Sequence, residues 1–109
     1  VNNIEIPEAE ESVYTEALLR EAHSSLDRVT SLMPKISNEL IYSVRTLRDP
    51  GLLADFIAAN ILVRYEDKQE ILEEFDAITR LALILSMLEN EEEILRCEMD
   101  IHQNNFFLF

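Results

Sequence analysis

The chain is 109 residues long and carries 22 acidic against 9 basic residues, a formal net charge of −13 at pH 7. A surface this negative repels the phosphates of nucleic acids and of anionic membranes, so we expect this chain to bind neither. With 48% hydrophobic residues but one glycine and three prolines, the composition favours one small all-α domain over sandwiches and barrels, which need many turns.

The first long helix is predicted over residues 12–32, after a connector at residues 1–11. Apolar residues spaced three or four apart form one stripe along this helix and into its end: Tyr14, Leu18, Ala22, Leu26, Val29 and Met33. Pro34 stops the helix. Ser37 is predicted to cap a second helix through residue 47, which buries Leu40, Ile41, Val44 and Leu47.

A third helix is predicted to begin at Asp49-Pro50 and to end near Asn60. The Asp carboxylate accepts a bond from an unpaired N–H of the first turn, and Pro has no N–H there to leave unpaired. Asn60 is expected to close the helix in the left-handed conformation. Leu53, Phe56, Ile57 and Ile61 recur at helical spacing. After an extended linker at 62–65, a short helix over residues 66–74 is predicted to bury Ile71, Leu72 and Phe75.

Asp76 is predicted to cap the last and longest helix, over residues 76–103. Its seam alternates spacings of three and four and has two polar members: Ile78, Leu81, Leu85, Leu88, Glu92, Leu95, Met99 and His102. A helix of roughly 40 Å is longer than a compact four-helix body needs. We therefore expect its second half to project or to find a partner, and the candidate partner surface is Leu85, Leu88, Leu95 and Met99.

Three readings remain open for residues 104–109, an apolar tail that contains Phe-Phe-Leu-Phe: a cloning or processing product, a divergent end, or an adhesive patch. Cys97 is the only cysteine. An internal disulfide is therefore impossible, and a reducing, cytoplasmic compartment is the simpler expectation.

Catalytic and cofactor motifs are not found in this sequence. Gly51 is the only glycine, whereas a phosphate-binding loop needs several and a Lys before Ser or Thr. Glu21 and His23, two apart, fall on different helix faces, while Glu98 and His102, four apart, have no second pair to complete a di-iron site. We predict no catalytic, cofactor or metal residues in this chain.

A second pattern in the chain lies in the order of residues between positions 49 and 81. It reads Asp49-Pro50, Leu53-Ala54-Asp55, Ile57-Ala58, Lys68-Gln69, Ile71-Leu72-Glu73, Asp76 and Arg80-Leu81. This order resembles the helical second half of the N-terminal domain of Lon, the ATP-dependent cytosolic protease. The resemblance is specific over residues 49–98 and loose over 13–47.

For the fold, the resemblance implies a bundle of four to five helices with a long, projecting C-terminal helix over residues 12–103. Residues 1–11 would be a linker after a β-rich subdomain that precedes the helices in this family. The motif residues are interpreted mainly as helix caps and core. Arg80 is expected to pair with Asp76 or Glu73, and Lys68-Gln69 is the pair with the least structural explanation, so a subunit or inter-subdomain contact is a second reading of it.

For function, the resemblance implies a non-catalytic part of an ATP-dependent serine endopeptidase whose ATP, Mg²⁺ and Ser–Lys pair belong to other domains. The expected partners are unfolded or damaged proteins and other subunits of a homo-oligomeric ring. Exposed parts of the 18–33 and 78–99 stripes would form apolar grooves for basic, apolar clients. The alternative is a purely structural helical spacer that associates with itself through the seam.

Overall fold

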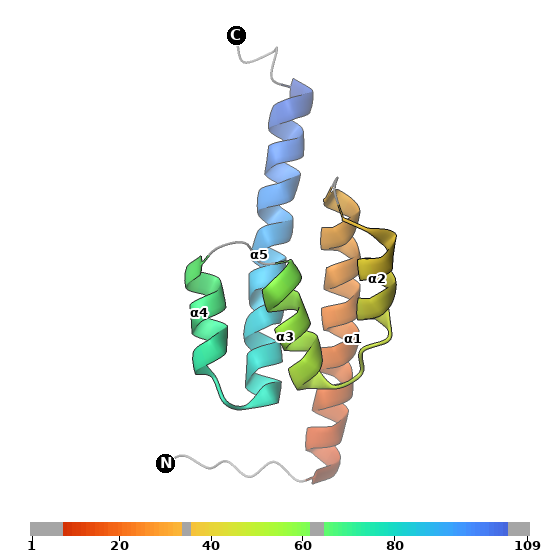
Figure 1. The fold of residues 1–109 in the computed structure, drawn as a ribbon, viewed down its shortest axis with the longest axis vertical. Helices are drawn as coiled ribbons and strands as arrows, with labels where there is room; N and C mark the ends of the chain where they lie inside the picture. The colour runs from red at the N-terminus through yellow and green to blue at the C-terminus, as the bar shows by residue number, and fades with distance from the viewer. Residues whose placement is uncertain (1–7, 34–35, 62–64, 105–109) are drawn as a thin grey trace.

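The computed structural model of this chain describes residues 8–33, 36–61 and 65–104. This part of the chain is all-α, as predicted, and contains no strand. It forms five helices: α1 (Glu8–Leu32), α2 (Asn38–Arg45), α3 (Pro50–Asn60), α4 (Tyr65–Glu73) and α5 (Ala77–Asn104). Successive helices run in alternating directions, so that α1, α3 and α5 are roughly parallel (Figure 1).

Three of the helix starts are fixed by the side chains that the sequence predicts. Oγ of Ser37 accepts a hydrogen bond from the backbone N–H of Leu40 (3.1 Å), and Oδ1 of Asp49 accepts one from Leu52 (3.0 Å). Oδ2 of Asp76 accepts bonds from the backbone N–H and the hydroxyl of Thr79, both at 2.8 Å. These bonds satisfy first-turn N–H groups that have no partner inside the helix.

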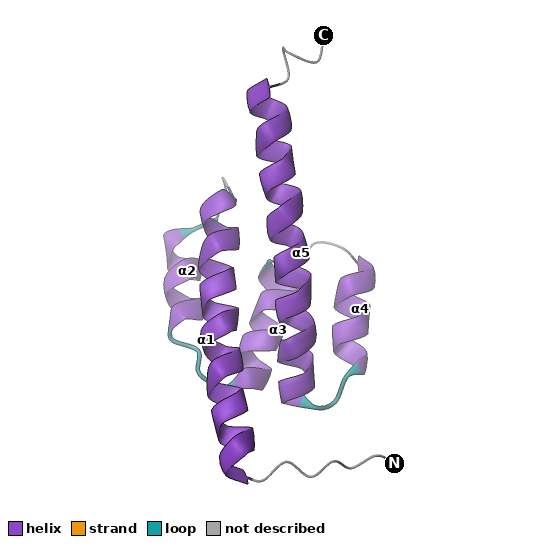
Figure 2. Ribbon diagram, turned by 180° about the vertical axis from the view of Figure 1, so that it is seen from behind, coloured by secondary structure: helices purple, strands orange, loops and turns teal. Residues whose placement is uncertain are grey.

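The first half of α5 packs against α1 and α3, while α2 covers the outer side of α1 and α4 lies beside α5 (Figures 1 and 2). Residues that are nearly or fully buried form one core between these helices: Leu18, Leu19, Ala22, Leu26, Val29, Val44, Leu53, Ala54, Ile57, Ala58, Ile61, Ile71, Leu81, Ile84 and Leu88. The stripes predicted on the first and third helices are therefore mostly correct. Ile84 lies outside the predicted seam of the last helix, yet it is fully buried.

The second half of α5 extends beyond the end of α1, as Figures 1 and 2 both show. The side chains from Arg96 to Gln103 are all exposed. The predicted long, projecting C-terminal helix is thus confirmed. No helix in the described part of the chain has the combination of length and hydropathy that a bilayer-spanning segment requires.

Several local predictions are wrong. α1 begins at Glu8, four residues before the predicted start, so part of the predicted connector is helical. Tyr14 is 47% exposed and Phe75 is 96% exposed, although both were predicted to be buried. Ile61 ends α3 with φ −112° and no non-glycine residue in the described ranges has a positive φ, so Asn60 adopts no left-handed conformation.

Two further predictions concern the segment between α3 and α4. Tyr65 is the first residue of α4 and does not belong to the linker. The predicted extended linker at 62–64, the tail at 105–109 and the side chain of Leu72 lie outside the described residues.

Candidate functional site

The family-like residues meet where α3 and α5 begin side by side. Asp49 and Asp76 cap the two helices, and Leu53, Ala54 and Leu81 are fully buried between them. The helices approach closely at Gly51, where a Cβ atom would lie 2.9 Å from Nη2 of Arg80 and 3.4 Å from Cβ of Ala77. A glycine at this point leaves room for the Arg80 guanidinium to lie over the start of α3.

Arg80 links three segments at this junction. Its Nη1 donates to the carbonyls of Glu74 (3.3 Å) and Phe75 (3.1 Å), which lie just before α5. Its Nε is buried and lies 3.6 Å from Oδ1 of Asp55 on α3, within ion-pair distance but beyond a hydrogen bond. The predicted pairing of Arg80 with Asp76 or Glu73 is therefore wrong, although its charge helps to lower the pKa of Asp76, behind the hydrogen bonds from Thr79.

Lys68 and Gln69 lie in α4, away from this junction. Gln69 is exposed, and Lys68 is half-buried beside a shallow apolar cleft between α3 and α4. The other residues that line this cleft of about 300 Å³ are Asp55, Ala58, Ala59 and Ile71. Thus the motif residues whose surroundings are described contribute caps, core packing and the Arg80 junction, while Lys68-Gln69 and the exposed Glu73 lie at the surface of α4.

A second and larger cleft lies where α1 ends and α5 continues past it. It has a volume of about 450 Å³, in the lower part of the roughly 300–1,000 Å³ range of binding pockets. Ser31, Leu32 and Met33 line it from the end of α1, and Leu95, Glu98, Met99 and His102 line it from α5. The four α5 residues fall at positions i, i+3, i+4 and i+7, so they share one helix face. We call the apolar lining residues (Leu32, Met33, Leu95 and Met99) the floor of the cleft and the polar ones (Ser31, Glu98 and His102) its rim.

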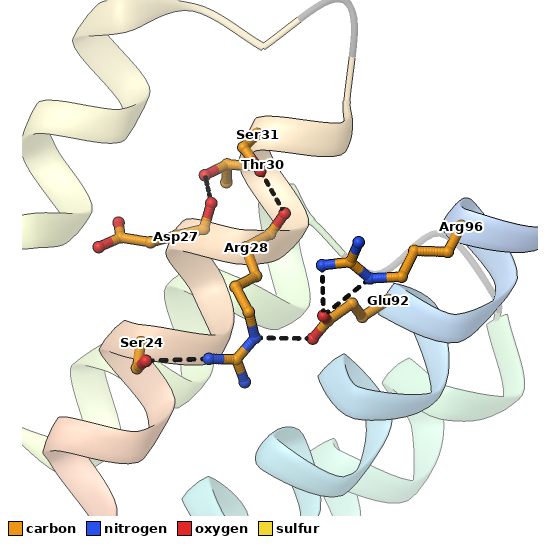
Figure 3. A network of polar contacts seen from close by, with 7 residues as sticks. All are labelled: Ser24, Asp27, Arg28, Thr30, Ser31, Glu92 and Arg96. Atoms are coloured by element: carbon orange, nitrogen blue, oxygen red, sulfur yellow. Dashed lines mark hydrogen bonds and ion pairs between the residues drawn. The ribbon is translucent and has the colours of Figure 1, made fainter. Parts of the chain in front are cut away.

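A polar network joins α1 to α5 about one helical turn before the residues that line this cleft (Figure 3). Nε of Arg28 on α1 donates to Oε1 of Glu92 on α5 (2.9 Å), and Nε and Nη2 of Arg96 donate to Oε2 (3.1 and 3.0 Å). Nη1 of Arg28 also donates to Oγ of Ser24 (3.0 Å). The hydrogen bonds from Arg28 and then from Arg96 hold the pKa of the Glu92 carboxyl below its usual value.

The predicted partner surface is only partly available. Leu88 is fully buried, so it belongs to the core and offers no exposed side-chain surface in this structure. Leu85 and Leu95 are half-buried, whereas Met99 is 42% exposed. The predicted polar seam member Glu92 bonds to Arg28 of the same chain, so in this structure it sets the register of α1 against α5 and is not free to pair with another subunit.

The 18–33 stripe was also expected to be partly exposed as a groove. Leu18, Ala22, Leu26 and Val29 are instead buried. Only the end of the stripe, at Met33, reaches the cleft. On α1 the last buried residue of the stripe is Val29, and on α5 the last buried residue of the seam is Leu88. Past Arg28 and Glu92, which pair with each other, the two stripes separate and line the cleft.

Other candidate residues form no site. Within the described ranges, no group of three or more His, Cys, Asp or Glu residues could hold a metal ion. Nε2 of His23 lies 2.8 Å from the carbonyl of Leu47, an acceptor only, so this nitrogen is the donor and His23 ties α1 to the segment after α2. Cys97 is a free, exposed thiol.

These features define a helical-bundle domain with an open, partly apolar surface cleft. The family described as the ATP-dependent protease La (LON) substrate-binding domain matches residues 1–90. The chain belongs to this family, and the resemblance stated from residues 49–81 is confirmed.

Full-length relatives agree with this assignment. The chain is 40% identical to a Lon protease of Brevibacillus choshinensis over 86 residues, which are 79% of this chain and 11% of that protein. It is 38% identical over 92 residues to a Lon protease of Geobacter metallireducens, covering 84% of this chain and 11% of that protein. With Lon protease 1 of Bacillus subtilis it shares 35% identity over 88 residues, which are 81% of this chain and 11% of that protein. The chain thus spans about a tenth of the length of the relatives it matches.

Proposed function

We propose that this chain is a non-catalytic, helical part of the N-terminal domain of an ATP-dependent Lon-type serine protease, and that it helps to recognise unfolded or damaged proteins. The family description supports a substrate-binding role. The observation that carries the proposal is the open cleft at the end of α1, where Leu32, Met33, Leu95 and Met99 offer apolar surface that α1 no longer covers.

Methionines suit this role because their flexible, polarisable side chains adapt to ligands of different shape. A cleft with an apolar floor and a polar rim takes a segment of an unfolded client more readily than a fully polar surface does, because burial of apolar area drives such binding. Folded proteins hide the side chains that would fill the cleft, so selectivity for unfolded clients follows from the same property.

The rest of the proposal concerns the whole protease. It would form a homo-oligomeric ring in the cytoplasm, use ATP and Mg²⁺ in another domain, and cut its substrates with a Ser–Lys pair in a third. This chain would contribute substrate contacts and part of the ring assembly. The second candidate function is a structural spacer that associates with itself, which the exposed side chains at Met99 and Ile101 favour.

Fluorescence anisotropy tests the proposal directly. A labelled, permanently unfolded protein is titrated with this chain, once with and once without residues 104–109. Saturable binding that survives removal of the tail supports recognition by the helices. Binding that disappears with the tail, or no binding in either form, contradicts it and leaves the spacer role as the better account.

A further inference from the structure

We propose that the α1–α5 cleft selects client segments that combine large apolar side chains with lysine or arginine, and that Glu98 is the carboxylate that reads the positive charge. This inference rests on the proposed substrate-binding function and adds the chemical class of the segment. Two features of the cleft carry it: the kind of surface on its floor and the sign of the charge that remains free around it.

The floor supplies apolar contact without a fixed shape. Met33, just after the end of α1, and Met99, on α5, line the cleft beside Leu32 and Leu95. Met99 is 42% exposed. An apolar side chain of a client that enters here removes thioether and leucine surface from water, which is favourable for any aliphatic or aromatic residue.

The net charge of α5 beside the cleft is negative. From Glu89 to His102, α5 carries six carboxylates and one guanidinium, that of Arg96. Among the described residues, Arg96 and Arg28 both bond to Glu92. These three groups together keep one positive charge, against the five other carboxylates of this stretch of α5. Glu98 lines the cleft and forms no ion pair with any described residue. A client cation that lies beside Met99 is therefore within reach of the Glu98 carboxylate.

Charge also argues against a second copy of this chain as the occupant. Two copies of α5 packed along this face would bring their acidic residues together, and like charges at close range destabilise such a contact. The whole chain carries a net charge of −13, so its long-range field favours the approach of cationic segments and opposes acidic ones. A basic, apolar client segment is the occupant that satisfies both the floor and the rim.

Three fluorescein-labelled peptides test this inference by anisotropy. They share the same Leu and Phe positions and differ only in the residues between them, which are Lys, Gln or Glu. At about 0.1 M salt, where charges interact over about 10 Å, we expect the Lys peptide to bind about tenfold more tightly than the Glu peptide. The difference should shrink at about 1 M salt, while the Gln peptide changes little.

Two matched variants locate the effect. Glu98→Gln should weaken binding of the Lys peptide by about two- to fivefold, the range of one exposed ion pair, and leave the Gln peptide unchanged. Glu93→Gln removes the same charge from the same helix. Glu93 is exposed and lies about 200° around the helix axis from Leu95, on another face, so this variant should change peptide binding little. Met99→Ser should weaken binding of the Lys peptide and of the Gln peptide by the same factor.

Equal binding of all three peptides overturns the charge selection and leaves the proposed function intact. Equal effects of the two glutamate variants overturn the assignment to Glu98 and to this cleft. If neither the peptides nor an unfolded protein binds, the proposed function fails and this inference fails with it.

Discussion

Shortening Leu88 to alanine is expected to destabilise the fold by about 3 kcal/mol or more. Leu88 is fully buried in the core on α5. Removing three carbons forfeits roughly 0.8 kcal/mol for each buried group, and the cavity that remains adds a further cost, which gives about 2.7–5 kcal/mol at comparable sites. A small domain has a total free energy of unfolding of only about 5–15 kcal/mol.

Urea unfolding followed by far-UV circular dichroism measures this change. With an m-value of about 1.5 kcal/mol per molar urea, the midpoint of Leu88→Ala should fall by about 2 M. Met99→Ala is the matched control, because Met99 lies on the same seam but is 42% exposed. Its free energy of unfolding should stay within about 0.5 kcal/mol of that of the original chain. A normal midpoint for Leu88→Ala, together with loss of an oligomer, would refute the placement of this residue in the core and restore it to a partner surface.

Four residues outside the core give shorter tests with the same unfolding assay. Arg28 and Arg96 lower the pKa of Glu92 in the folded chain, so the ion pairs contribute their full stability above the ordinary carboxyl pKa and lose it as the pH falls through the lowered value. The original chain should therefore lose its stability advantage over Glu92→Gln in that acid range. A difference in stability that does not depend on pH would contradict this. Asp76→Ala should cost about 0.5–2 kcal/mol through the lost cap, Asp76→Asn less, and equal losses would point away from capping. Phe75→Ser should change stability by less than about 0.5 kcal/mol because Phe75 is 96% exposed; a large loss would mean that its ring is buried. Arg80→Lys should cost about 1–2 kcal/mol, since one ammonium cannot serve two carbonyls and Asp55 together, whereas Arg20→Lys, at an exposed pair, should cost little.

Local rules predicted the starts of α2, α3 and α5 correctly because the capping partners lie within three residues. The caps at Ser37, Asp49 and Asp76 each need only their own side chain and an N–H in the first turn. The stripe on α1 from Leu18 to Val29 was predictable for a related reason, since one helix face packs on one neighbouring surface.

Residues whose surroundings come from distant segments were not predictable in this way. α5 packs on both α1 and α3, so its buried arc is wider than one seam and includes Ile84. Helical spacing from Ile71 suggested that Phe75 was buried, but α4 ends at Glu73 and Phe75 follows outside it. Arg80 was assigned a partner nearby in the sequence, Asp76 or Glu73, because the approach of Asp55 depends on how α3 and α5 pack. The cleft at Met33 and Met99 was missed as a location for the same reason, although both residues were on the predicted stripes.

The division of α5 at Glu92 also bears on the two candidate functions. Up to this residue the seam is occupied by α1 and α3, so it is not available to another chain. Beyond it, the seam retains Leu95, Met99 and His102, about one heptad, whereas a seam that identifies a coiled coil continues over about three or four. Self-association through this part of α5 alone would therefore bury little surface and would oppose carboxylates with carboxylates. A client segment that enters the cleft needs neither a long seam nor a matching acidic face, and for this stretch of chain client binding is the better use of the exposed residues.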